Sequence, residues 1–257
     1  MRLSLRLAFL PAVLVLAAAG VTTMAGERMK PRERATSHLK VAQSFYIAGR
    51  YGEALSTVDK SLKEDSSYVP AHQLRGQILV SIDKLDDAIK EFDHALQLDG
   101  GYTEARNWKG FALVQLKRFD EAMQEYQKAL NDLTYATPEV IHLNIGKLQR
   151  LRGDDNAALD SLRKSVNLNP SFASGYYELG MTYEKLGRDR EALKAYQDAL
   201  VGMDSSPDLN LRLGIALAKS GDGPKAKQHF EKVIKLAPDG KEAAQARDEM
   251  RKLRPAS

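Results

Sequence analysis

Apolar and polar positions alternate along most of this chain with the period of an α-helix, in pairs of short segments separated by turns. Between Thr103 and Leu133, apolar side chains recur three and four positions apart, which gives one apolar stripe to each of two helices. A polar interruption at Lys117-Arg118 separates the two stripes. The pattern predicts a helix-turn-helix unit in which the two amphipathic helices bury their stripes against each other.

The same unit recurs six times at a nearly constant interval. One alanine of each unit lies 34, 34, 36, 34 and 34 residues after its predecessor, and a small residue stands twelve positions before it. The pairs are Ala42 and Ala54, Gly76 and Ala88, Gly110 and Ala122, Gly146 and Ala158, Gly180 and Ala192, and Gly214 and Ala226. Such a period indicates stacked units, none of which buries its apolar face alone. We therefore expect an all-α solenoid whose function resides on its surfaces, with small residues where paired helices approach closely.

Glycine and proline mark the ends of the expected helices. Glycines occupy the turn inside four of the units, where a helix ends and a positive φ is favourable, at Gly49, Gly153, Gly187 and Gly221. The turns at Asp83-Lys84 and Lys117-Arg118 lack glycine. Two helix starts combine a capping hydroxyl, a proline and an acid, in Thr137-Pro138-Glu139 and Ser206-Pro207-Asp208. We expect both hydroxyls to cap their helices.

These residues resemble the tetratricopeptide repeat family. The family pattern of glycine, aromatic and alanine positions is most complete in Gly180, Tyr183, Ala192, Tyr196 and Ala199. Departures are Trp108, two places later than the usual tryptophan, and Ala42 and Ser61 in the first unit. The resemblance implies a right-handed superhelix with the first helix of each repeat on the concave side. It covers residues 35–240, as repeats 35–68, 69–102, 103–138, 139–172, 173–206 and 207–240.

The segments flanking the repeats differ from them in composition. Arg2 and Arg6 precede an uncharged apolar stretch at 7–21, and small residues follow it, which is typical of a secretory signal at residues 1–25. We expect cleavage after Ala25, with Ala19 as the alternative, and a basic linker at 26–34. If the stretch 7–21 is retained, it becomes an anchor in the inner membrane. Residues 241–257 read as an amphipathic cap helix and tail that closes the array.

Composition narrows the class of protein. The chain has 38 Lys and Arg against 34 Asp and Glu, and much of the excess lies before residue 35, so a basic stripe for nucleic acid is not expected. It contains no cysteine, which excludes disulfides, thiolate metal sites and a lipidated cysteine. The five histidines form no zinc motif, and no nucleophile or phosphate-loop motif is present. We therefore expect no cofactor and no enzyme activity, and a location in a bacterial periplasm.

The concave face implied by the resemblance supplies the candidate site. Apolar side chains there alternate with amides, a combination that suits an extended peptide or a partner protein. The candidate partner-binding residues are Leu39, Gln43, Tyr46, Gln77, Asn107, Phe111, Leu143, Lys147, Tyr177 and Met181. The alternative is that several of these positions only pack against the next repeat, as we expect for Leu211 and Ile215. The carboxylate clamp of some family members is missing, because Leu39 and Gln43 fill the places where it would begin.

A narrower resemblance points to a process. Six repeats and the stretch Leu211-Arg212-Leu213-Gly214-Ile215-Ala216-Leu217-Ala218-Lys219 are similar to the pilotin-type tetratricopeptide proteins of type IV pilus biogenesis, which help an outer-membrane secretin assemble. Their lipidated cysteine is absent, and Val21 stands near its place. Two alternatives remain: a membrane-anchored repeat subunit of an inner-membrane complex, and an enzyme with a site built across repeats from residues such as His142, Lys147 and Asp154.

Overall fold

The structure is a computed structural model that describes residues 29–253, and every regular element within that range is an α-helix. The expected signal segment 1–25 therefore lies outside the described residues. The thirteen helices of the described range are α1 Pro31–Ile47, α2 Tyr51–Glu64, α3 Val69–Ser81, α4 Leu85–Leu98, α5 Thr103–Gln115, α6 Phe119–Leu130, α7 Pro138–Arg152, α8 Asp155–Leu168, α9 Ala173–Lys185, α10 Asp189–Met203, α11 Pro207–Lys219, α12 Gly223–Leu236 and α13 Lys241–Lys252.

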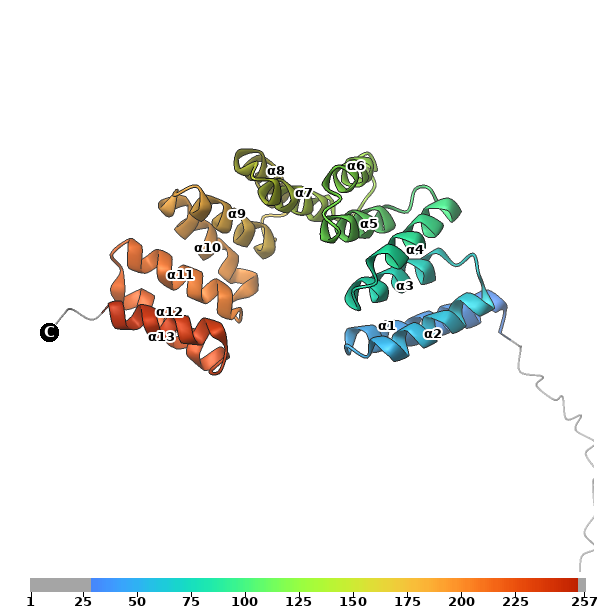
Figure 1. The fold of residues 1–257 in the computed structure, drawn as a ribbon, viewed down its shortest axis with the longest axis horizontal. Coiled ribbons are helices and arrows are strands. Elements are labelled where there is room, and N and C mark those ends of the chain that lie inside the picture. The colour runs from blue at the N-terminus through green and yellow to red at the C-terminus, as the bar shows by residue number, and fades with distance from the viewer. Residues whose placement is uncertain (1–28, 254–257) are drawn as a thin grey trace, which may run out of the picture.

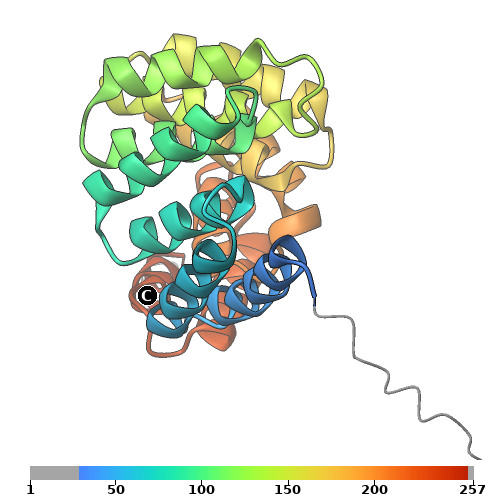
Figure 2. The same cartoon turned by 90° about the vertical axis from the view of Figure 1, so that its right-hand side faces the viewer.

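The helices stack as six antiparallel pairs along an arch (Figure 1). Each second helix packs against the first helix of the next pair, and α1, α3, α5, α7 and α9 also pack one against the next. Elements on the inside of a curve approach each other most closely, so the first helices form the inner face. Figure 1 shows α5 and α7 on the inner side of α6 and α8. The helix axes change direction from pair to pair, as the side view in Figure 2 shows.

In the five repeats whose first helix carries a glycine at this position, the glycine lies under a large side chain of the partner helix. A Cβ at Gly110 would stand 2.5 Å from Tyr126 Cε1, and one at Gly214 would stand 2.5 Å from Phe230 Cε1. Gly76 faces Phe92, Gly146 faces Leu162 and Gly180 faces Tyr196 in the same way. The repeated alanine is buried in all six units. The expected close approach of paired helices is confirmed in these five repeats: an aromatic ring covers the glycine in four of them and Leu162 covers it in the fourth repeat.

The turn within each pair uses a left-handed residue. Gly49, Gly153, Gly187 and Gly221 have φ values of 71°, 88°, 69° and 88°, as the glycine pattern predicts. In the two turns that lack glycine, Asp83 and Lys117 take the same conformation, each with φ 60°. A side chain in this region is strained, so the fold imposes the turn even where the local sequence disfavours it.

Of the two hydroxyls that the sequence predicts as helix caps, one caps its helix and the other does not. Ser206 Oγ accepts a hydrogen bond from the Leu209 N–H at 3.2 Å, as predicted. The prediction for Thr137 is wrong: its hydroxyl makes no capping bond, and the Val140 N–H donates to the Thr137 carbonyl at 3.0 Å instead. The reason is backbone conformation, because Thr137 has φ −131° and ψ 57° whereas Ser206 has the extended ψ of 118° that suits a capping hydroxyl.

Specific contacts define both ends of the helical array. The first helix begins at Pro31, so residues 31–34 of the expected linker are helical, and Glu33 accepts from the Lys30 N–H at 2.8 Å. At the other end, α13 packs on α12 and α11. Ala243 and Ala246 of α13 are fully buried against the last repeat, which leaves its charged face to solvent.

Candidate functional site

The inner face of the array carries the candidate residues, but the structure gives them different environments. Gln43 is exposed, while Leu39, Asn107 and Leu143 are buried. Leu39 and Leu143 belong to the hydrophobic core, so packing is their main role in this structure. The remaining candidates are half-buried, with part of each side chain open to the arch: Tyr46, Gln77, Phe111, Lys147, Tyr177 and Met181.

In the first half of the arch, hydrogen bonds between neutral polar side chains join neighbouring repeats. Ser81 Oγ donates to Tyr46 Oη at 3.4 Å, which joins α3 to α1. Tyr102 Oη donates to Gln73 Oε1 at 3.2 Å, across the next repeat boundary. Burial, with smaller contributions from Glu104, Tyr68 and Asp99, raises the pKa of Tyr102 to about 12, so this hydroxyl keeps its proton at neutral pH.

A hollow of about 310 Å³ lies where α5 meets α7, at the middle of the arch. Its lining combines two aromatic rings, one aliphatic side chain and two amides, from Asn107, Trp108, Phe111, Val140 and Asn144. The rings of Trp108 and Phe111 meet edge to face, with centroids 5.7 Å apart. Asn144 Nδ2 donates to Asn107 Oδ1 at 2.8 Å, which uses one N–H group and one acceptor position of this amide pair.

In the second half of the arch, charged side chains of neighbouring repeats neutralise one another. Glu178 of α9 accepts from Arg150 Nη2 at 2.7 Å and lies 3.7 Å from Lys147 Nζ. Lys185 Nζ donates to Asp155 Oδ1 at 2.8 Å. Lys147, which the sequence predicts as a binding residue, is therefore already engaged with a carboxylate of the next repeat.

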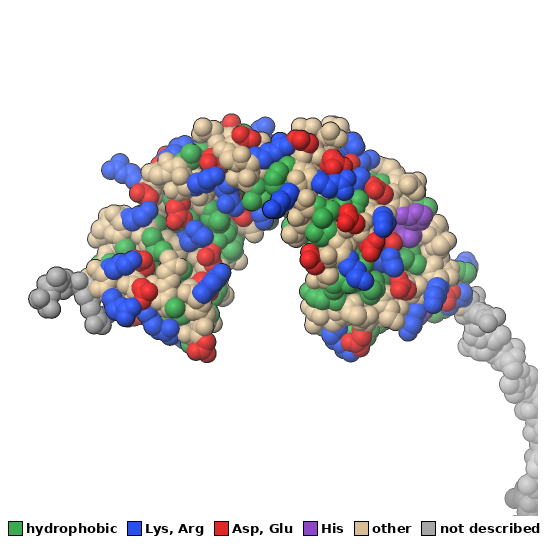
Figure 3. Space-filling model, viewed as in Figure 1, with side chains coloured by type: hydrophobic (Ala, Val, Ile, Leu, Met, Phe, Trp, Pro, Cys, Tyr) green, Lys and Arg blue, Asp and Glu red, His purple; other side chains and the backbone are tan. Residues whose placement is uncertain are grey.

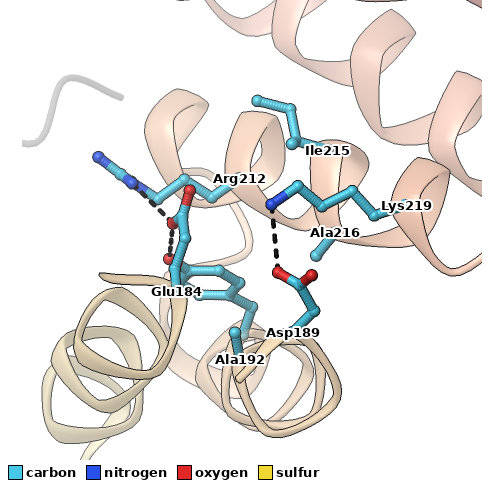
Figure 4. Close-up of a pocket in the computed structure, with 8 residues that line it drawn as sticks. Glu184, Asp189, Ala192, Arg212, Ile215, Ala216 and Lys219 are labelled. Carbon is cyan, nitrogen blue, oxygen red and sulfur yellow. Dashed lines mark hydrogen bonds and ion pairs between the residues drawn. The ribbon is translucent and has the colours of Figure 1, made fainter. Parts of the chain in front are cut away.

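A network centred on Arg212 joins α9, α10 and α11 (Figure 4). Arg212 donates from Nε to Asp208 Oδ2 and from Nη1 to Glu184 Oε2, each at 3.0 Å, and Tyr196 Oη donates to the same Glu184 oxygen at 2.5 Å. Tyr177 Oη donates to Asp208, and burial together with this carboxylate raises the pKa of Tyr177 to about 12. The Tyr177 hydroxyl thus has an internal partner, and its ring lies 6.3 Å from that of Tyr196.

Three side chains that the sequence analysis did not select take part in the contacts described above. Trp108, Asn144 and Glu178 each lie one position after a candidate on the same helix. Successive positions on a helix point about 100° apart, so the position after a candidate reaches the groove only where it is not buried. Trp108 and Asn144 do so in the lining of the hollow, whereas Ile78, Ala112 and Leu148 follow other candidates and are buried in the core. The helical pattern alone does not separate these two cases.

A second hollow, of about 330 Å³, lies between α9 and α10 away from the inner-face network. Tyr176, Leu179 and Tyr183 form its apolar wall, and Arg190, Glu191, Lys194 and Asp198 form a mixed charged rim. Elsewhere on the visible face, charged side chains of both signs are interspersed without a patch of one sign (Figure 3). That distribution offers no stripe for a nucleic-acid backbone on this face.

The described residues contain no group of three His, Cys, Asp or Glu side chains placed to hold a metal ion. Of the residues that an enzyme across repeats would use, Asp154 is exposed at the start of α8 and Lys147 is paired with Glu178. Within residues 29–253, no helix combines the length and apolar character needed to cross a bilayer. The candidate anchor at 7–21 lies outside that range.

This architecture defines the class of protein as an α-helical solenoid of paired helices with an open inner face. The chain belongs to the tetratricopeptide repeat family: models of this repeat match residues 83–134, 146–187, 176–210 and 208–240. No curated protein sequence matches the chain. The fold of this family is generally a scaffold for protein interactions.

Solved structures share the fold over most of the chain. PilW, described as a widely conserved type IV pilus biogenesis factor, is 24% identical with a TM-score of 0.72, over 82% of this chain and 96% of PilW. PilF of Pseudomonas aeruginosa is 20% identical with a TM-score of 0.73, over 86% of this chain and all of the PilF chain. YrrB, described as having an unusual peptide-binding site, is 22% identical with a TM-score of 0.51, over 74% of this chain and 97% of YrrB.

Proposed function

We propose that this protein is an exported scaffold that binds an extended segment of a partner protein along the first half and the middle of its inner face. The hollow between α5 and α7 carries this proposal, because it joins an apolar pocket to an amide pair with free hydrogen-bonding capacity. An apolar side chain of the partner would enter between Trp108, Phe111 and Val140. The amides of Asn107 and Asn144 would pair with its backbone.

The distribution of charge favours this half of the arch over the other. Carboxylates already hold Lys147, Arg150 and Arg212, so a charged ligand would have to displace existing ion pairs. Breaking a partly buried ion pair costs free energy. A new ion pair with the ligand would only restore that free energy, so the exchange would give no net gain in binding. Tyr46, Gln77 and Phe111 are uncharged and half-buried, and Gln43 and Ile47 add exposed, uncharged side chains in the first repeat. We place Tyr177 and Met181 at the far end of the same groove.

The process that we propose is assembly of an envelope complex, with the type IV pilus and its secretin as the specific case. Similarity of fold to PilW supports this case. Support also comes from the sequence, through the basic residues and apolar stretch at 1–25 and the motif from Leu211 to Lys219. In a deletion strain, we expect fewer secretin multimers and fewer surface pili. Normal multimers and normal pili would leave only the general scaffold function.

Site-specific photo-crosslinking in cells tests the groove. A photoreactive residue is placed at Gln43 or at Gln77 on the inner face, and as a matched control at Gln127, which is exposed on α6. We expect a discrete crosslinked product from the inner positions and none from Gln127, and we expect Phe111→Ala to reduce it. A product from Gln127 alone would place the partner on the outer face and contradict the proposal.

Export and anchoring are tested separately by N-terminal sequencing of the protein recovered from the cell envelope. The proposed soluble periplasmic form starts at Gly26. A start at Met1 in a membrane fraction would support the alternative in which residues 7–21 anchor the array to the inner membrane.

A further inference from the structure

His72 lies on the outer side of the junction between the first two repeats, where α3 packs between α2 and α4. Its side chain is 10% exposed. Ring atom Nδ1 lies 2.8 Å from Glu91 Oε2 of α4, and Nε2 lies 2.9 Å from the Ser66 carbonyl in the α2–α3 turn. One imidazole thus spans from the second helix of its own repeat to the end of the preceding repeat.

Both partners of this ring are acceptors. A carbonyl oxygen has no proton to donate, and an ionised carboxylate has none either. A neutral imidazole carries a single N–H, so it satisfies one partner and turns a lone pair toward the other. Only the imidazolium, with two N–H groups, donates to both at once.

The charged and titratable groups around the ring come from four helices and the turn. Glu91 also accepts from Arg75 Nη1, and Arg75 Nε donates to Asp59 Oδ1 of α2 at 2.8 Å. The His94 ring of α4 meets His72 edge to face at 4.3 Å between centroids. In the turn, Asp65 lies 3.0 Å from Arg32 Nε of α1. The two negative charges of Asp59 and Glu91 exceed the single positive charge of Arg75, so the cluster favours a second cation at His72.

The surroundings of His72 raise its pKa. Burial disfavours the imidazolium, but the hydrogen bonds to Glu91 and Ser66 and the charge of Glu91 outweigh burial and the opposing charge of Arg75. The pKa of His72 is therefore raised above its ordinary value of about 6.5. The pKa of Glu91 is lowered, since its bonds to His72 and Arg75 outweigh the burial that would raise it.

We propose that His72 is a proton-controlled clamp between the first and second repeats. The charged ring ties the α2–α3 turn to α4, and loss of its proton releases one of the two contacts. Because α1 packs on α3 and Tyr46 meets Ser81 across that contact, release of the clamp loosens the first repeat at the inner face as well. This last consequence rests on the proposed function of the groove; the clamp itself does not.

The array contains an internal comparison at His229. Its Nδ1 lies 2.9 Å from Asn210 Oδ1, a single acceptor that the neutral ring can satisfy. Burial and Lys232 lower the pKa of His229, against a smaller opposing effect of Asp204. A proton therefore strengthens the junction at His72 and weakens the packing at His229, which separates the clamp from any general effect of pH on the fold.

Nitrogen-15 NMR of the imidazole rings in the full chain tests the clamp without a variant. At pH 6 we expect both nitrogens of His72 to show imidazolium shifts, and the titration midpoint to lie above 6.5 and to fall in Glu91→Gln. A single protonated nitrogen at pH 6, or a midpoint at or below 6.5, would overturn the proposal.

Hydrogen exchange then measures how the charge of His72 affects the local stability of α3. As the pH rises from 6 to 8, protection of α3 amides, corrected for intrinsic rates, should fall by about tenfold for each unit by which the His72 pKa exceeds 6.5. His72→Gln should abolish this dependence and His94→Gln should keep it; the reverse result would overturn the clamp. In wild type, crosslinking from Gln43 should fall over the same range. Crosslinking absent at every pH, with the protection change present, would contradict the proposed groove function alone.

Discussion

The ring of Tyr196 occupies the space that a side chain at Gly180 would need: a Cβ built at residue 180 would stand 2.4 Å from both Cδ1 and Cε1 of that ring. Tyr196 is 1% exposed, so the ring cannot move out to solvent without opening the core of the fifth repeat. The distance between α9 and α10 is therefore fixed by one glycine and one ring; three other repeats contain the same kind of contact, and in the fourth repeat Leu162 takes the place of the ring.

Substitution of Gly180 by leucine should separate α9 from α10 and destabilise the fifth repeat by about 2–4 kcal/mol through overpacking and strain. Because repeats couple mainly to their neighbours, hydrogen exchange should show lost protection around α9 and α10 and retained protection in α1 to α4. Gly52→Leu is the matched control, since a Cβ at Gly52 meets no atom within 4 Å. Uniform loss of protection would mean that the array unfolds as one cooperative unit.

The left-handed turn residue Lys117 offers a stabilising change. Lys117→Gly removes the strain of a side chain at φ 60° and should stabilise the third repeat by about 1 kcal/mol, after allowance for the greater freedom of glycine in the unfolded chain. Asp83→Gly should gain less, because aspartate tolerates this conformation better than lysine. Thermal unfolding of the two variants checks the order, and a lower midpoint for Lys117→Gly would contradict the strain argument.

The Arg212 network should contribute to the stability of the last two repeats. Arg212→Ala leaves Glu184 and Asp208 without their shared cation, and we expect a loss of about 1–2 kcal/mol, a figure reduced for the 29% exposure of the arginine side chain. Lys219→Ala breaks the half-exposed ion pair between Lys219 and Asp189, and it should lower the free energy of unfolding by less than about 0.5 kcal/mol. Equal losses in chemical denaturation would show that the network adds nothing beyond a surface ion pair.

Acid should weaken the sixth repeat through His229. The folded-state pKa of this residue is lowered by burial and Lys232, so its contribution is complete above the unfolded value of about 6.5 and is lost as the pH falls below it. Protection of α11 and α12 amides should therefore decrease on acidification from about pH 7 to pH 5. In His229→Gln this decrease should be smaller, and an unchanged decrease would assign it to another group.

Tyr46→Ala should weaken partner binding by about 1–3 kcal/mol, because the Tyr46 ring is half-buried at the open end of the groove. The measurement is the apparent affinity from crosslinking at Gln77. The helical circular dichroism should not change. Tyr177→Ala is the contrasting variant. Its hydroxyl donates to Asp208, so we expect a lower unfolding temperature along with any change in binding. Lost helicity in Tyr46→Ala would identify that ring as part of the core.

Much of the fold could be predicted from the sequence because its determinants are local. The helical periods and the turn glycines of four units act within one helix pair, and Gly180 and Tyr196 are only sixteen positions apart. The failure at Thr137 marks the limit of such rules. A capping hydroxyl depends on the backbone angles of its own residue, and those are set by the seven-residue connection between α6 and α7.

By itself, the sequence determined the repeat and the paired helices, and it predicts which positions of the first helices face the inside of the arch. Only the tertiary structure decided which of those side chains are available. Arg150 and Glu178 lie 28 positions apart, and Asn107 and Asn144 lie 37 apart, so each pair meets only because successive repeats are stacked at a particular rotation. Periodicity fixes directions within a helix, whereas the angle between repeats is a property of the packed interface. That angle places the amides of Asn107 and Asn144 in the lining of the hollow at the middle of the arch, and it pairs the charges of Arg150 and Glu178 beyond them.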